Sequence, residues 1–399
     1  AMLPQSGGMY VYLQKAYGRC VGFLQGWSWF LFTKPAAIGA LSMIFVEHLE
    51  AVAGISISTS GAIGLAVILI GGLALINVIG VLWGGWVQNV TTVIKVAFVL
   101  FVACLPYLVS VFGEGGFSTG LLSQSLSVTD TAPPLAGRFA VVLLAVMWAY
   151  NGWHGITPVA EEIRDPGRNI PRALLGGTLV LTVLYVSANV AYHGVVPMVE
   201  MAEPENQERV AVLMFDRLLG PRGAMLIALG VMVSTFGAIN SNMLLGPRVP
   251  FAMGRDDPLL RWLGAVHPRF RTPARAIVLQ GLMGVFMLIG SACLVRWVPS
   301  LQGTSMFAIL TGYIIFASSL FYMLTVAAVL VLRKKMPDAE RPFRCPAWVP
   351  LLYLVFYSWF LYNVYQRKPV EANIGILLNL SGLPVFVAGL WWARRRSGS

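Results

Sequence analysis

Charged side chains are scarce in this chain of 399 residues: Asp, Glu, Lys and Arg make up 11% of it, whereas 57% of residues are hydrophobic. The mean hydropathy of +0.74 lies far outside the range of soluble domains. The composition therefore excludes an ordinary soluble enzyme or binding module and predicts an integral membrane protein.

Cysteine and histidine are also rare, at four residues each. The cysteines form no Cys-x-x-Cys pair and none lies near a His at metal-ligand spacing, so we expect inert thiols, no metal and no cofactor. No Ser/His, His-Glu-x-x-His or paired-Asp constellation supports an enzyme. The N-terminus lacks the basic region and cleavage pattern of a signal peptide.

Long apolar runs are what the sequence has in abundance. A membrane helix needs about 20 mostly apolar residues. Ten stretches meet this requirement, with only loop-sized polar connections between them: 20–46, 61–82, 86–112, 137–160, 173–196, 222–247, 275–298, 304–332, 347–366 and 372–393. We therefore predict an all-α membrane protein with about ten transmembrane helices and no separate soluble domain.

Acidic residues are fewer than basic ones, 17 against 28, which gives a net charge of +11. The cations sit in short loops rather than on one solvated face, so nucleic acid is not the expected partner. If residues 1–19 are cytoplasmic, alternating the ten spans puts 18 cations in loops on that side and seven in loops on the other. The positive-inside rule then predicts a cytoplasmic C-terminus.

One predicted span is interrupted. The run from Leu143 to Glu162 begins as a membrane helix, is broken by Asn151, Gly152, Gly155 and Pro158, and ends in charge. Broken backbone is tolerated at membrane depth only where it is buried in protein or lines a cavity, which is how carriers build binding sites. This pattern indicates a transporter.

Several motifs occur along the chain in an order that is typical of one family of membrane carriers. The most specific is Glu-Glu-Ile-Arg-Asp-Pro-x-Arg-Asn-Ile-Pro at 161–171, in which Asp165 replaces the usual Asn. Pro-x-Ser-Gly-Gly-x-Tyr-x-Tyr-Leu at 4–13, Trp-Ala-Tyr-Asn-Gly-Trp at 148–153, Gly-Pro-Arg at 246–248 and Pro-Asp-x-Glu-Arg-Pro at 337–342 also fall in family order. In type and order these motifs resemble those of the amino acid–polyamine–organocation superfamily, and within it the L-type amino acid transporters. The resemblance covers essentially the whole chain.

This family has twelve helices, ten of them in two inverted repeats with broken helices one and six. Only one broken span is visible here, so the resemblance implies either a fragment or a degenerate protein that lacks the first helix and most of the second. A fragment is the favoured interpretation. It divides a single polytopic domain, 1–399, into four parts. These are 1–19 (the end of the second helix and a cytoplasmic loop), 20–136 (the rest of the first repeat), 137–332 (the second repeat) and 347–393 (the last two helices).

The broken sixth helix is the expected substrate site. Exposed N–H groups at a half-helix end suit a carboxylate and free carbonyls suit an ammonium, so Ala149, Tyr150, Asn151 and Gly152 are expected to border a zwitterion. By resemblance, Trp148 caps the bound amino acid; ordinary packing is the alternative.

Lys95 lies about nine residues into its span, too deep to reach water easily. By resemblance it matches a lysine whose ammonium stands where sodium sits in sodium-coupled relatives. The same resemblance places Ser234 and Thr235 at this site, where they could accept hydrogen bonds from Lys95, although hydroxyls bonding their own helix are an equal alternative. Lys34 is interpreted as structural or pathway-lining.

His154 stands where the family often has a small polar residue. It titrates near neutral pH and could carry a coupling proton, but a neutral, hydrogen-bonded histidine is the favoured interpretation. The adjacent Glu161 and Glu162 have no nucleophile or metal cluster beside them, so we interpret them as a cytoplasmic gate paired with nearby arginines.

The expected function is sodium-independent transport of L-amino acids, neutral ones above all, by alternating access, as an exchanger or with protons. The alternatives are a membrane sensor that binds without transporting and a non-functional fragment. The expected location is the plasma membrane, the inner membrane of a bacterium. The loop 47–60 lacks the cysteine that joins animal L-type transporters to a glycoprotein, so no disulfide-linked heavy subunit is expected, and a homodimer stays open.

Overall fold

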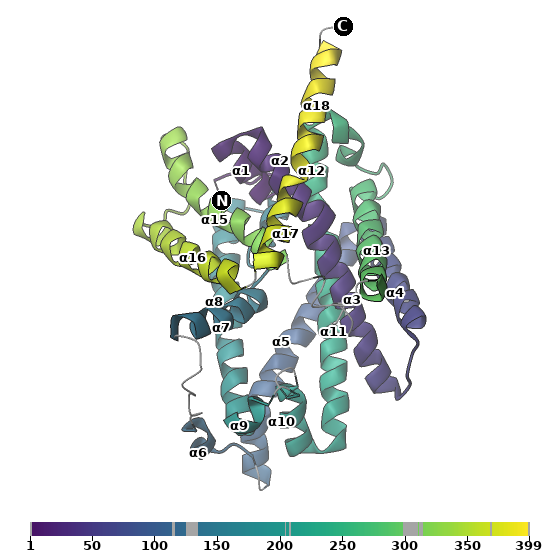
Figure 1. The fold of residues 1–399 in the computed structure, drawn as a ribbon, viewed down its shortest axis with the longest axis vertical. Helices are drawn as coiled ribbons and strands as arrows, with labels where there is room; N and C mark the ends of the chain where they lie inside the picture. Colours follow the sequence, from purple (N-terminus) through teal and green to yellow (C-terminus); the bar gives the residue numbers. More distant parts are fainter. Residues whose placement is uncertain are drawn as a thin grey trace.

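The protein is built from α-helices, as the computed structural model in Figure 1 shows. The structure describes residues 2–113, 116–124, 135–203, 205–206, 209–297, 310, 314–367 and 369–397, and these contain no strand. In chain order the elements are α1 (Met9–Tyr17), α2 (Arg19–Ser28), η1 (Trp29–Thr33), α3 (Lys34–Ala53), α4 (Thr59–Ile79), α5 (Val81–Phe112), α6 (Thr119–Leu122), α7 (Leu135–Ala149), η2 (Thr157–Glu162), α8 (Pro166–His193), α9 (Met198–Met201), α10 (Val210–Leu219), α11 (Pro221–Leu245), α12 (Arg248–Asp256), η3 (Pro258–Gly264), α13 (Ala274–Trp297), α15 (Ile314–Lys335), α16 (Trp348–Arg367), α17 (Pro369–Leu380) and α18 (Gly382–Ser397).

The all-α membrane fold predicted from the sequence is confirmed. Within the described residues, eight helical stretches are long and apolar enough to cross a bilayer. They correspond to eight of the ten predicted spans. The other two correspond to α7, which stops after 15 residues at the break, and to α16, whose 20 residues include many Tyr and Trp side chains.

The first long span is wider in its middle than a regular α-helix. Helices α2 and α3 are joined without a gap by η1, a π-helical turn in which the Lys34 N–H donates to the Trp29 carbonyl five residues earlier. Pro35 follows at once and has no N–H to offer, which gives a local reason for the altered hydrogen bonding. Such turns often mark functional positions in helices.

Helix α11 lies at the centre of the bundle and packs along α3 on one side and α5 on the other. Helices α13 and α4 lie against α3 and against each other, and α8 lies against α5 (Figure 1). Glycine permits a close approach of α3 and α13: a Cβ at Gly39 would lie 3.3 Å from the Gly284 carbonyl oxygen.

A close approach of backbones also fixes α12 against η3. A Cβ at Gly254 would lie 2.6 Å from the Leu260 carbonyl oxygen, and a backbone atom cannot swing aside. We predict that Gly254→Ala lowers the free energy of unfolding by about 1–3 kcal/mol, read as a fall in the melting temperature of the detergent-solubilised protein. Gly72→Ala in α4 is the control, because no atom lies within 4 Å of its added Cβ. Equal melting temperatures for the two variants would contradict the prediction.

Candidate substrate site at the helix break

The predicted interruption of the sixth helix is present. Helix α7 ends at Ala149, residues 150–156 form turns, and a 3-10 helix begins at Thr157. Gly152 adopts a φ of 106°, a conformation that disfavours any residue with a side chain. Backbone bonds from Gly155 N to Gly152 O (2.7 Å) and from Thr157 N to His154 O (2.9 Å) close the turns.

Tyrosines from two other helices hold the broken segment. Tyr322 of α15 donates to Asn151 Oδ1 at 3.0 Å, and Tyr185 of α8 donates to the freed Ala149 carbonyl at 3.3 Å. Tyr150 donates to Thr182 Oγ1 of α8 at 3.1 Å, and its ring packs edge-on against Tyr185. The segment is thus unwound but positioned from α8 and α15. Of these tyrosines only Tyr150 was predicted; Tyr322 and Tyr185 give no sequence signal, because aromatic residues are common in every span.

A cavity of about 780 Å³ opens beside the break. Its lining includes Tyr150, Asn151, Trp153 and His154 from the broken segment, and Tyr322 from α15. This volume lies within the usual range for small-molecule sites. Ala149 and Gly152 of the expected site belong to the same segment, whereas the side chain of Trp148 lies outside the described part of the chain.

His154 is packed among aromatic rings. Its ring centroid lies 5.3 Å from Trp29, 5.3 Å from Trp153 and 5.0 Å from Tyr322. The side chain is 1% exposed, and neither ring nitrogen has a hydrogen-bond partner in the described residues. The hydrogen bond expected from the sequence is therefore not found among these residues. Leaving a buried polar group without a partner costs about 1–3 kcal/mol.

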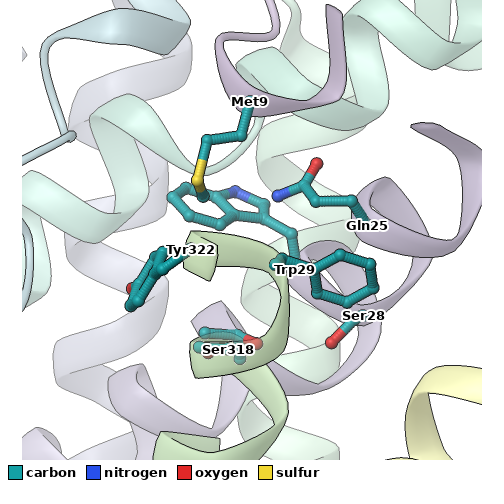
Figure 2. A pocket seen from close by; sticks show the side chains of 8 residues that line it. Met9, Gln25, Ser28, Trp29, Ser318 and Tyr322 are labelled. Atoms are coloured by element: carbon teal, nitrogen blue, oxygen red, sulfur yellow. The ribbon is translucent and has the colours of Figure 1, made fainter. Parts of the chain in front are cut away.

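Lys34 also contacts Trp29, one of the three rings around His154. Its Nζ donates to Asn242 Oδ1 of α11 at 2.9 Å and stands 4.3 Å from the centre of the Trp29 ring, a cation–π contact. Figure 2 shows Trp29 with Met9 above it and Tyr322 beside it, around a small cavity of about 10 Å³. Gln25 Oε1 and Ser318 Oγ border this cavity and are buried without hydrogen-bond partners in the described chain.

Lys95 lies against α11, but not at Ser234 or Thr235, the two hydroxyl residues expected from the sequence. A Cβ at Gly237 would meet Lys95 Cε at 2.9 Å and Thr91 Oγ1 at 2.6 Å, so Lys95 lies across that glycine. Thr235 donates instead to carbonyls of its own helix, at 2.8 and 3.1 Å, and Ser234 is exposed. The structure therefore supports the helix-backbone alternative for Thr235, and it does not bring Ser234 or Thr235 into hydrogen-bond contact with Lys95.

The sequence analysis missed a buried amide network next to Lys95. Asn77 of α4 donates to Asn240 Oδ1 of α11 at 2.9 Å. Asn240 in turn donates to the Gly84 carbonyl at 3.0 Å and to Gln88 Oε1 at 3.2 Å, both in α5. The sequence signal for this network was the presence of amide side chains within apolar runs, because a buried amide needs hydrogen-bond partners.

The two glutamates after the break do pair with arginines of α12. Glu162 bonds Arg248 at 3.1 Å and Glu161 bonds Arg255 at 3.1 Å. The Arg248 side chain is 2% exposed, whereas the other three are between 37% and 52% exposed. No cluster of three metal-ligating side chains occurs in the described residues.

Helix α12 is also held from α1. Tyr10 and Gln14 donate to Asp256 Oδ2 at 3.0 and 3.2 Å. Burial and the neighbouring Asp256 carboxylate raise the pKa of Tyr10 well above its usual value, so its hydroxyl stays a donor at neutral pH. The Gly7 N–H donates to the Pro158 carbonyl at 3.3 Å, which joins the turn before α1 to η2. Elements α1, η2 and α12 thus form one three-way joint immediately after the break.

Comparison with known proteins now identifies the class. Residues 1–389 match the family described as amino acid permease, and the chain belongs to that family. It is 32% identical over 389 residues to the serine/threonine exchanger SteT of Bacillus subtilis, covering 96% of this chain and 82% of that protein. It is 30% identical to the human large neutral amino acids transporter small subunit 2 and 29% identical to the mouse Asc-type amino acid transporter 1. Each of these two alignments covers 98% of this chain and 70% of the relative.

These similarities confirm the resemblance to the amino acid–polyamine–organocation superfamily and its L-type transporters. They support amino acid transport in a membrane as the general activity. The relatives are transporters by name rather than enzymes.

We predict that Tyr322→Phe lowers the initial rate of amino acid uptake into proteoliposomes about two- to tenfold, because it deletes a single buried hydrogen bond. Its partner, Asn151, would then lose the contact that fixes it beside the cavity. Tyr17→Phe is the control, because it removes a hydrogen bond of the same 3.0 Å length to the Leu324 carbonyl, outside the broken segment. Equal rates for the two variants would show that the Asn151 contact does not matter for transport.

Proposed function

We propose that this protein carries neutral L-amino acids across the plasma membrane by alternating access and without sodium. The observation that carries the proposal is the unwound segment 150–156, held by α8 and α15 beside a cavity of about 780 Å³. Similarity to a serine/threonine exchanger and to a large neutral amino acids transporter supports the substrate class. The exchanger relative also favours exchange over coupling to protons.

In this proposal the backbone from Ala149 to Gly152 binds the zwitterion. The C-terminal end of α7 offers carbonyls to the ammonium, and N–H groups of the turn suit the carboxylate. Trp148, the residue just before this segment, covers the bound amino acid and excludes water, which strengthens the polar contacts beneath it.

Lys95 takes the role of a fixed cation in place of sodium. Its position against Gly237 of α11, in a span long and apolar enough to cross the membrane, supports this assignment. The site then differs from the one expected from the sequence in one respect. Thr91, rather than Ser234 or Thr235, is the hydroxyl residue that meets Gly237 together with Lys95.

Glu161 and Glu162 form the cytoplasmic gate with Arg255 and Arg248. The pairs tie the end of the broken helix to α12, so opening toward the cytoplasm requires breaking them. This places the joint of α1, η2 and α12 on the cytoplasmic side, together with the C-terminus. The inverted-repeat division at residues 136–137 belongs to the same proposal, as does a carrier without a disulfide-linked heavy subunit; a homodimer stays open.

We expect uptake of a neutral L-amino acid by the full-length protein in proteoliposomes to persist when choline replaces sodium. The fixed ammonium of Lys95 removes the need for a bound cation. Lys95→Ala should abolish most of this uptake while leaving the protein inserted. Strict dependence on sodium in the wild-type protein would refute the role given to Lys95.

The two ion pairs of the gate should differ in how much they contribute to uptake. Glu161→Gln weakens a pair that is exposed on both sides, so uptake should change less than about fivefold. Glu162→Gln leaves the buried Arg248 guanidinium without its carboxylate, so uptake should fall at least about tenfold. Initial rates are measured at matched protein amounts. Equal effects of the two neighbouring substitutions would mean that burial of Arg248 is irrelevant to the gate.

A further inference from the structure

Histidine 154 differs from the other three histidines of the chain. Nδ1 of His48 lies 2.8 Å from the Ile44 carbonyl oxygen, and Nδ1 of His193 lies 2.9 Å from that of Asn189. His267 accepts from two backbone N–H groups at 3.3 Å. Only His154 has two buried ring nitrogens that no described residue satisfies. Because buried polar groups are nearly always hydrogen-bonded, this side chain calls for a partner of another kind.

The surroundings of His154 favour a neutral ring. Three aromatic rings contact it, and the Lys34 ammonium lies over one of them, Trp29. The ion pairs found among the described residues join other side chains, so no carboxylate offsets a charge on the imidazole. Burying an uncompensated charge is costly. A neutral imidazole presents one N–H donor and one bare nitrogen acceptor at the same time.

The position of His154 connects it to the substrate cavity. It follows Asn151 by three residues and lines the same cavity as Tyr150 and Asn151. Of the rings around it, Trp153 is 42% exposed, against 4% for Trp29 and 7% for Tyr322. Trp153 is therefore the most exposed of the three rings, and it is the one whose displacement would open the imidazole to the cavity.

We propose that His154 recognises the side chain of the substrate and selects amino acids whose side chain can donate or accept a hydrogen bond there, such as a hydroxyl or a carboxamide. This inference rests on the proposed function and names the substrate class of the same site. A hydroxyl can accept from the N–H of a neutral imidazole or donate to its bare nitrogen, whereas an aliphatic side chain can satisfy neither. Sites built to bind a hydroxyl reject the isostere that lacks it.

The test compares threonine with valine, which have nearly the same shape. In proteoliposomes the wild-type protein should take up threonine with a kcat/KM at least about tenfold above that for valine. His154→Phe keeps a flat ring among the aromatic neighbours but removes both polar atoms, so the two amino acids should come within about twofold of each other. His154→Asn keeps a donor and an acceptor and should preserve most of the preference.

Two further variants make the test specific. His193→Leu removes another histidine that does not line the cavity, and the threonine preference should not change. His154→Leu serves if the phenylalanine variant does not fold. An equal preference in the wild-type and both non-polar variants, or no preference in the wild-type protein, would overturn the inference.

Binding is measured in parallel, as the rise in melting temperature that each amino acid causes in the purified protein. Wild-type protein that binds threonine over valine but transports neither would count against the proposed function while supporting recognition by His154. Uptake of both amino acids at equal efficiency would support transport and refute the selectivity. Neither binding nor uptake would overturn both proposals.

Discussion

The rest of this structure depends on one constraint, the need to satisfy backbone polar groups where no water is available. The segment 150–156 leaves the helix, and its neighbours are arranged to make that tolerable. Tyr185 takes up the carbonyl freed at Ala149, Tyr322 fixes Asn151, and short turn bonds close the path to η2. Helices α8 and α15 are thus needed for the break as much as for the core. The cavity of about 780 Å³ lies beside the segment that these helices hold.

Three cations, Lys34, Lys95 and Arg248, converge on one continuous helical stretch, α11 with α12. Lys95 lies across Gly237, Lys34 donates to Asn242, and Arg248 belongs to the stretch itself. They are compensated in different ways: Arg248 by a carboxylate, and Lys34 by a neutral amide and an aromatic face. The amide network of Asn240 fixes the same stretch to α4 and α5. The stretch formed by α11 and α12 is therefore suited to stay fixed while η2 and α1 move against it.

Much of this arrangement could be predicted from the sequence. Helices that cross the bilayer need long apolar runs, and charged or helix-breaking residues within such runs are costly. The break between Asn151 and Pro158 and the pairing of Glu161 and Glu162 with arginines are visible as such exceptions. The partners of Lys95 were not predictable in detail, since Ser234, Thr235 and Gly237 lie within one helical turn and only packing decides which of them faces α5. The surroundings of His154 were not predictable for the same reason, because packing alone decides them. Trp29, Trp153 and Tyr322 come from three separate parts of the chain, and no local pattern announces that they meet.

The electrostatics also bear on the proposal that this protein is an exchanger. Lys34 and Lys95 are positively charged side chains within membrane-spanning helices, and neither has a carboxylate partner in the described residues. Under the proposed function, a bound amino acid brings a carboxylate into the helix bundle, which would lower the cost of enclosing these charges away from water. The empty carrier lacks that carboxylate, so its reorientation would cost more than that of the loaded carrier. A carrier that moves readily only when loaded must bring one amino acid back for each one it delivers, which is exchange.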